Sequence, residues 1–223
     1  MPRTISIGSQ DFETIITNHY FYIDKTSFIK EWWENGDSVT LITRPRRFGK
    51  TLNMSMVEQF FSIEYANRSD LFEELDIWKD EKYRALQGTI PVIALSFANV
   101  KENTYEKTKI RICQILTDLY IKRMFLRNSS VLTEKDREYF DRVSEKMTDT
   151  DAVIALHKLS DFVLRYYGKK PVILLDEYDT PMQEAYINGY WEEITGFIRN
   201  LFHSTFKTNA YLERAVMTGI TRV

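Results

Sequence analysis

The sequence predicts an α/β fold in which helices cover both faces of a mainly parallel sheet. Short apolar runs of strand length alternate with amphipathic segments of helix length along the 223 residues. The run Val172–Leu175 has apolar residues without alternation, which is typical of a strand buried on both faces of a parallel sheet. Strands separated by helices favour right-handed crossovers, and in such sheets ligands bind beyond the carboxyl ends of the strands.

Each element is predicted from its apolar spacing and its end signals. A turn at Asn35-Gly36 precedes the first strand, and Gly168 with Pro171 ends a helix and prevents its continuation. Thr133 with Asp136 three residues later resembles a capping box that begins a helix. The predicted strands are 39–43, 91–97, 172–175 and 211–218, and the predicted helices are 51–63, 104–125, one from Thr133, 152–167 and 191–206.

Composition excludes several classes of protein. The chain is 43% hydrophobic with a net charge of −2, which argues against disorder and against coating nucleic acid by bulk charge. No apolar run approaches the roughly 18 to 20 residues that cross a bilayer, and the N-terminus lacks a signal-peptide core. Cys113 alone cannot build a disulfide framework, and its apolar helical surroundings predict a buried thiol. We therefore expect a soluble cytoplasmic domain without a membrane partner.

The segment Arg44–Thr51 joins the first predicted strand to a helix. A phosphate chain needs converging backbone N–H groups and a helix N-terminus, and Gly49 permits a tight turn into that helix. Lys50 is predicted to reach the β- and γ-phosphates, and the Thr51 hydroxyl to bind Mg²⁺. The motif departs from the usual P-loop because Arg44 stands where the first glycine is expected. The alternative interpretation is a basic surface turn.

Four cations fall within seven residues of this segment: Arg44, Arg46, Arg47 and Lys50. Such a run usually marks a solvated face or a nucleic-acid patch. Here it lies between a buried strand and a buried helix, which favours a loop that faces phosphate. We assign Arg46, Arg47 and Phe48 to the nucleotide-binding segment, although the sequence does not decide which arginine contacts the ligand.

The second candidate is the strand Val172–Leu175 with the carboxylates that follow it, Asp176 and Glu177. Asp176 is predicted to lie near Mg²⁺, and Glu177 beside the γ-phosphate, where it would polarise an attacking water. The alternative is two acids that open a solvated loop. The phosphate loop upstream favours the catalytic interpretation, and together the two motifs predict a three-layer P-loop NTPase fold.

A third candidate lies at the end of the last predicted strand. A polar side chain there would hold the lytic water against the γ-phosphate; Thr218 is the first choice and Thr221 the second, with Arg222 as a phosphate contact. Ordinary loop polarity explains these residues equally well. The histidines His19, His157 and His203 lie in separate segments without metal-ligand spacing, so no metal site is predicted from them.

Three segments together resemble the bacterial AAA-ATPase-like domain, which commonly precedes a restriction-endonuclease-like nuclease domain: Phe21–Ile29, Arg44–Thr51 and Leu175–Pro181. The resemblance implies ATP and Mg²⁺ as cofactors, and it assigns Gly49, Lys50 and Thr51 to nucleotide and metal, and Asp176 and Glu177 to metal and water. Asp24 and Lys25 match the Asp-Lys-Thr motif of the family, and we expect them to frame the nucleotide base. ATP rather than GTP rests on the resemblance alone.

The resemblance spans nearly all of residues 1–223 as one incomplete P-loop domain. The family continues with a further strand, a helical lid and usually the nuclease domain, so we expect these beyond Val223 and consider the chain truncated. The function expected is an ATP-binding and Mg²⁺-dependent ATP-hydrolysing module that couples nucleotide state to a C-terminal effector domain. Nucleic acid would be met only through that domain, and oligomers are compatible with the sequence. The alternatives are a non-catalytic nucleotide-binding or scaffold module for a protein partner, and a phosphotransferase, which the Asp176-Glu177 pair disfavours.

Overall fold

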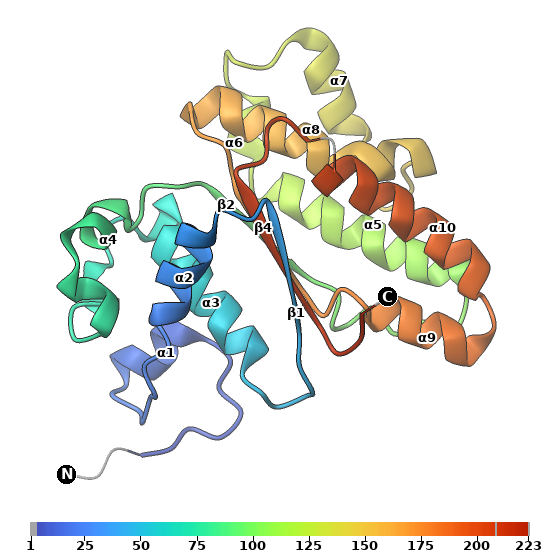
Figure 1. Cartoon of the computed structure of the whole chain (residues 1–223). Coiled ribbons are helices and arrows are strands. Elements are labelled where there is room, and N and C mark those ends of the chain that lie inside the picture. Colours follow the sequence, from blue (N-terminus) through green and yellow to red (C-terminus); the bar gives the residue numbers. More distant parts are fainter. Residues whose placement is uncertain (1–3, 208, 223) are drawn as a thin grey trace.

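A four-stranded parallel sheet organises the chain (Figure 1). The computed structural model describes residues 4–207 and 209–222. The strands are β1 (Val39–Thr43), β2 (Val92–Ser96), β3 (Val172–Asp176) and β4 (Arg214–Gly219), in the spatial order β1-β4-β3-β2. All three pairings are parallel, so within the described residues the sheet is wholly parallel. The last strand is inserted between β1 and β3, which brings its carboxyl end beside theirs.

Helices cover both faces of this sheet, with α1 to α4 on one side and α5, α8 and α10 on the other (Figure 1). The helices are α1 (Phe12–Thr17), α2 (Ser27–Asn35), α3 (Lys50–Phe61), α4 (Glu81–Leu86), α5 (Tyr105–Ile121), α6 (Met124–Arg127), α7 (Glu134–Arg142), α8 (Asp149–Tyr167), α9 (Thr180–Asn188) and α10 (Trp191–Phe202). Short 3₁₀ turns lie at Ile63–Tyr65, Ser69–Leu71 and Asp76–Lys79, and a π-helical turn lies at His203–Lys207.

Strand β3 shows why its sequence lacks alternation. Val172 and Leu174 belong to the core beneath α3, whereas Ile173 and Leu175 belong to the core beneath α5, α8 and α10. All five residues of the strand are buried. A strand covered on both faces needs apolar side chains at every position, so the prediction of a two-sided buried strand is confirmed.

Several end signals behave as the sequence predicts. Thr133 and Asp136 form the reciprocal capping box at the start of α7. Gly168 ends α8 in the left-handed conformation with φ 67°, and Gly36 ends α2 with φ 74°. Among the aromatic residues of the N-terminal part, Trp32 is 3% exposed and belongs to the core, whereas Phe21 is 52% exposed.

Other boundaries differ from the prediction. The expected helix 104–125 is interrupted after α5, because Arg123 leaves helical geometry and its guanidinium donates to the carbonyl of Val92 at the base of β2. The helix expected to reach residue 206 ends as α10 at Phe202 and continues as the π-helical turn. The last strand begins at Arg214 rather than Tyr211, since the N–H of Tyr211 donates to the side chain of Asn209 in a turn.

Candidate functional site

A cavity of about 830 Å³ lies at the carboxyl ends of β1, β2 and β3, and we name it the edge pocket. Its position agrees with the expectation for a parallel sheet, whose ligands bind beyond the carboxyl ends of the strands. Segments far apart in the sequence form its walls. They are residues 7–10, Arg46, Arg47, residues 49–52, Ser96, Ala98, Lys101, Asp176, Glu177 and Thr180.

The loop between β1 and α3 curls around the ammonium of Lys50. This side chain is only 7% exposed, and its Nζ donates to the carbonyls of Arg44 (2.9 Å) and Pro45 (3.2 Å). Gly49 precedes α3 with φ 74°, as the predicted tight turn requires, and Arg47 takes φ 68°. A glycine cap offers no side-chain acceptor, so the first-turn amides of α3 remain available to an anion.

Asp176, at the end of β3, links helix α3 to strand β4. The Thr51 hydroxyl donates to Oδ2 of Asp176 at 2.7 Å, and the Thr218 hydroxyl donates to Oδ1. The carboxylate is 6% exposed and Thr218 is 1% exposed. Three residues predicted from separate motifs are thus in direct contact, because β4 lies between β1 and β3 and its carboxyl end reaches Asp176 from the side.

Glu177 follows in a left-handed backbone conformation with φ 53°, which is uncommon for a residue with a Cβ atom. Its backbone N–H donates to Oδ1 of Asp176 at 3.1 Å. The turn directs the side chain back over the loop, where Oε1 lies 3.6 Å from Nζ of Lys50. A cation and an anion, both largely buried, therefore face each other across the pocket.

The remaining loop residues divide into two groups. Arg46 and Arg47 line the edge pocket, together with Gly49, Lys50 and Thr51. Phe48 does not line it and is 61% exposed.

Asp24 and Lys25 also lie outside the lining of the pocket. The Asp24 carboxylate accepts hydrogen bonds from the N–H and hydroxyl of Thr26 and from the N–H of Asp76. Thr221, the second choice for holding water, donates its hydroxyl to Asp179 instead. Arg222 is exposed and is not part of the pocket lining.

Sequence reasoning missed other residues of this region. Lys101, Ser96 and Thr180 line the pocket, as do residues 7–10. The signal for Ser96 and Lys101 was present, because the second predicted strand ends there and the carboxyl ends of parallel strands share one edge. The N-terminal wall had no such signal, since its position depends on tertiary packing.

Asp179 was also missed, although it lies within the Leu175–Pro181 motif. It is fully buried, and its Oδ2 accepts the backbone N–H groups of Ile220 (2.9 Å) and Thr221 (2.8 Å). Tyr178 donates its hydroxyl to the carbonyl of Thr221. The second half of the motif therefore holds the loop that follows β4.

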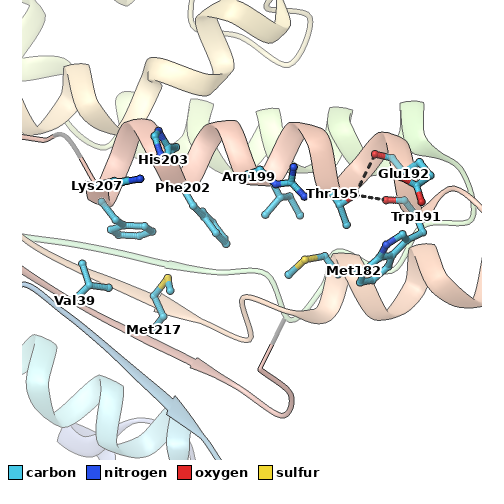
Figure 2. Close-up of a pocket in the computed structure, with 12 residues that line it drawn as sticks. Val39, Met182, Trp191, Glu192, Thr195, Arg199, Phe202, His203, Lys207 and Met217 are labelled. Atoms are coloured by element: carbon cyan, nitrogen blue, oxygen red, sulfur yellow. Dashed lines mark hydrogen bonds between the residues drawn. The ribbon is translucent and has the colours of Figure 1, made fainter.

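A second cavity, of about 580 Å³, lies between α10 and the strands β1 and β4, and we name it the α10 groove. Figure 2 shows Phe202 extending from α10 into the groove, with the strand residues Val39 and Met217 on the opposite side. Arg199 and Lys207 add positive charge to this largely apolar lining. The groove contains none of the predicted nucleotide-binding residues.

Within residues 4–207 and 209–222, no helix is long and apolar enough to cross a membrane. Across the same residues, no group of three or more His, Cys, Asp or Glu side chains could hold a metal ion. Thr51 and Asp176 offer two oxygen donors rather than such a group, and Mg²⁺ is commonly held by one or two protein ligands together with substrate phosphates.

Comparison with known proteins identifies the family to which the chain belongs. No solved structure matches the chain. A curated protein of Azotobacter chroococcum mcd 1, named "Uncharacterized protein in vnfD 5'region", is 26% identical over 222 residues, covering 99% of this chain and 38% of its own length. The chain thus spans about two fifths of that relative. A family model described as "Predicted AAA-ATPase" matches residues 6–223, and the chain belongs to this AAA-ATPase-like family, for which nucleotide binding is implied.

Proposed function

We propose that the edge pocket binds ATP with Mg²⁺ and that the chain hydrolyses it. One observation carries the proposal: the ammonium of Lys50 and the carboxylates of Asp176 and Glu177 line a single cavity at the N-terminus of α3. Its volume of about 830 Å³ lies within the range of roughly 300 to 1,000 Å³ that is usual for small-molecule and cofactor sites. Membership in a family of predicted AAA-ATPases supports the same assignment.

Lys50 is the proposed ligand of the β- and γ-phosphates. Its buried ammonium is satisfied by two neutral carbonyls and by Glu177 at 3.6 Å. A phosphate oxygen carries more charge than a carbonyl and forms the stronger, charge-assisted bond. The bound nucleotide would therefore replace these carbonyls as the hydrogen-bond acceptor of the Lys50 ammonium. The free backbone amides at the start of α3 would donate to the remaining phosphate oxygens.

The Thr51 hydroxyl and the Asp176 carboxylate fit Mg²⁺, which prefers oxygen ligands and keeps several waters. They are already in contact at 2.7 Å, so a single cation could be reached by both, directly or through water. When bound, the metal would neutralise charge on the phosphates. Thr218 holds the other oxygen of the same carboxylate and so fixes its orientation.

Glu177 is the proposed residue that orients the attacking water. While it faces Lys50, its carboxylate is engaged with the ammonium. Once phosphates occupy Lys50, Glu177 is released to accept a hydrogen bond from water beside the γ-phosphate. The strained backbone at Glu177, with φ 53°, directs its side chain into the pocket and supports this role.

The base would lie toward residues 7–10, a wall of the edge pocket that is separate from the phosphate-facing loop. This wall is anchored through Asp11, whose carboxylate accepts hydrogen bonds from Thr14, Ser55 and Gln59. The preference for ATP over GTP is supported by the family alone.

We further propose that nucleotide state is coupled to an effector domain. The chain covers 38% of the length of the relative described above, which leaves room there for further domains. The γ-phosphate would hold loops in one arrangement and release them on hydrolysis. Oligomerisation remains part of the same proposal, as does a cytoplasmic location.

A second candidate is nucleotide binding without hydrolysis. The Lys50–Glu177 contact favours it, because an ion pair retained in the complex would keep the carboxylate from water. A phosphotransferase is disfavoured, since a water-activating glutamate would divert the phosphoryl group to water.

The test is titration calorimetry of ATP with Mg²⁺, followed by phosphate-release assays. Loss of a charged hydrogen bond costs about 1.5 to 3 kcal/mol, so Lys50→Ala should weaken ATP binding by roughly 10- to 150-fold. Glu177→Gln should keep the affinity and lose turnover. Lys135→Ala, which changes an exposed lysine on α7, serves as the control and should match the wild type.

Equal ATP affinity in the wild type and Lys50→Ala would refute the assignment of the loop. Tight ATP binding without phosphate release in the wild type would select the non-hydrolysing candidate.

A further inference from the structure

The Asp-Lys-Thr segment at residues 24–26 is a rigid turn whose outer residues have structural partners. Asp24 accepts hydrogen bonds from the N–H of Thr26 (2.8 Å) and from the N–H of Asp76 (2.7 Å). Thr26 is fully buried, and its hydroxyl accepts the N–H of Ile77 at 3.2 Å. The hydrogen bonds from Asp76 and Ile77 attach the turn to the 3₁₀ segment Asp76–Lys79. The first and third residues of the motif are therefore explained by local structure.

Lys25 stands between these two anchors, and its side chain is exposed. The Nζ atom lies beside the loop, because a Cβ atom added to Gly49 would be 3.7 Å from it. Within the described part of the chain, this ammonium has no hydrogen bond or ion pair of its own. The turn thus places the ammonium of Lys25, which has no carboxylate partner among the described residues, beside the start of α3. Lys25 lies about two dozen residues earlier in the sequence than this helix start.

The loop next to Lys25 carries further cations. Arg46 and Arg47 line the edge pocket, and of the loop's cations only Lys50 has a carboxylate within salt-bridge distance among the described residues. Like charges in one region repel one another, and an anion bound among them reduces that repulsion. The concentration of charge therefore favours a polyanionic ligand over a neutral one.

We infer that Lys25 binds the phosphate chain of the nucleotide as a second lysine beside Lys50, in place of a role in framing the base. The inference rests on the proposed function and names one more residue of that site. The Nζ atom of Lys25 lies next to Gly49, at the turn into α3 where phosphate is expected. Lys25 is not part of the lining of the edge pocket and lies at its phosphate-facing end, whereas residues 7–10 form another wall of the pocket.

The test compares three ligands, each with Mg²⁺: ATP, GTP and tripolyphosphate. Calorimetric titrations would use the wild type, Lys25→Met, Lys25→Arg and, as control, Lys135→Met. Lys25→Met should weaken binding of all three ligands by a similar factor of about 5 to 30, because the lost bond is to phosphate. Lys25→Arg should recover most of the affinity, and Lys135→Met should behave as the wild type.

A loss confined to ATP, with tripolyphosphate unchanged, would overturn the inference and restore the base-framing role. Unchanged affinity for every ligand would also overturn it. Lys50→Ala in the same series distinguishes a failure of the role of Lys25 from a failure of the proposed function. If Lys50→Ala loses ATP while Lys25→Met does not, only the role of Lys25 fails; if Lys50→Ala still binds ATP normally, the proposed function fails as well. Thermal melting of each variant verifies that the exposed substitutions leave the fold intact.

Discussion

Replacing Thr218 by valine tests whether the contact with Asp176 is part of the catalytic arrangement. The carboxylate is 6% exposed and receives hydrogen bonds from the Thr218 hydroxyl, the Thr51 hydroxyl and the N–H of Glu177. Valine has nearly the same shape as threonine but removes one donor from a buried charge, at a cost of about 1 to 2 kcal/mol. For a chain of this size, that corresponds to a decrease of roughly 2 to 8 °C in Tm.

Thr218→Ser is the matched control because it keeps the hydroxyl and removes a buried methyl group, which costs about 1 kcal/mol. The two variants should therefore unfold at similar urea concentrations. We expect them to differ in turnover: Thr218→Val should release phosphate at least about tenfold more slowly than the wild type, since Asp176 loses one of the three donors that orient it toward the proposed metal position. Thr218→Ser should stay within about threefold.

Urea unfolding followed by tryptophan fluorescence gives the free energy of unfolding, and a phosphate-release assay with Mg²⁺ gives the rate. Equal turnover in Thr218→Val and Thr218→Ser would refute the reasoning, because the hydroxyl would then have no effect beyond packing.

Two further predictions concern the supporting structure. Asp11→Ala should lower the free energy of unfolding by about 2 to 3 kcal/mol, measured by urea unfolding. The change removes the cap of α1 and takes from the buried Gln59 amide the nearer of its two acceptors, leaving it Ser55; Asp11→Asn should cost less than half as much. Burial raises the pKa of Asp11, but hydrogen bonds from Thr14, Gln59 and Ser55 outweigh it and place the pKa below its usual value, so this stabilisation is present at neutral pH and is lost as the pH falls below about 4. Burial also raises the pKa of the Cys113 thiol to about 11. A disulfide reagent at pH 8 should therefore label this thiol at least about tenfold more slowly in the native protein than in urea. Equal labelling rates in the two conditions would contradict the burial of Cys113.

The parts of the fold that could be predicted from sequence are those with strong periodicity or a local end signal. The four strands and the long helices satisfy that condition, and the capping box at Thr133 gave one boundary almost to the residue. The helices α1, α2 and α4 have six to nine residues, a length at which isolated helices are unstable and tertiary packing decides. Helix α9 could have been found, because Pro181 lies in its first turn and Gly189 follows its last residue.

The candidate site shows the same division. Lys50, Thr51 and Asp176 follow strands or begin a helix. Because ligands bind beyond the carboxyl ends of parallel strands, the sequence alone predicts that these residues lie close together. The contact of Thr218 with Asp176 depends on the strand order, in which β4 separates β1 from β3. Sequence gives the strands in chain order only, so this contact required the structure.

The Leu175–Pro181 motif works as one unit with two functions. Its first half directs Asp176 and Glu177 into the edge pocket, and its second half, Tyr178 and Asp179, holds the loop after β4. Gly219 has no room for a side chain between them, since a Cβ atom would lie 2.6 Å from Oδ1 of Asp179 and 2.6 Å from the ring of Tyr178. The strand end that carries Thr218 is therefore fixed against the same turn that sets the unusual backbone of Glu177. A change in the backbone conformation of Glu177 on ATP binding would accordingly shift the loop after β4, because the buried Asp179 carboxylate holds that loop. This contact gives the proposed coupling a defined physical route.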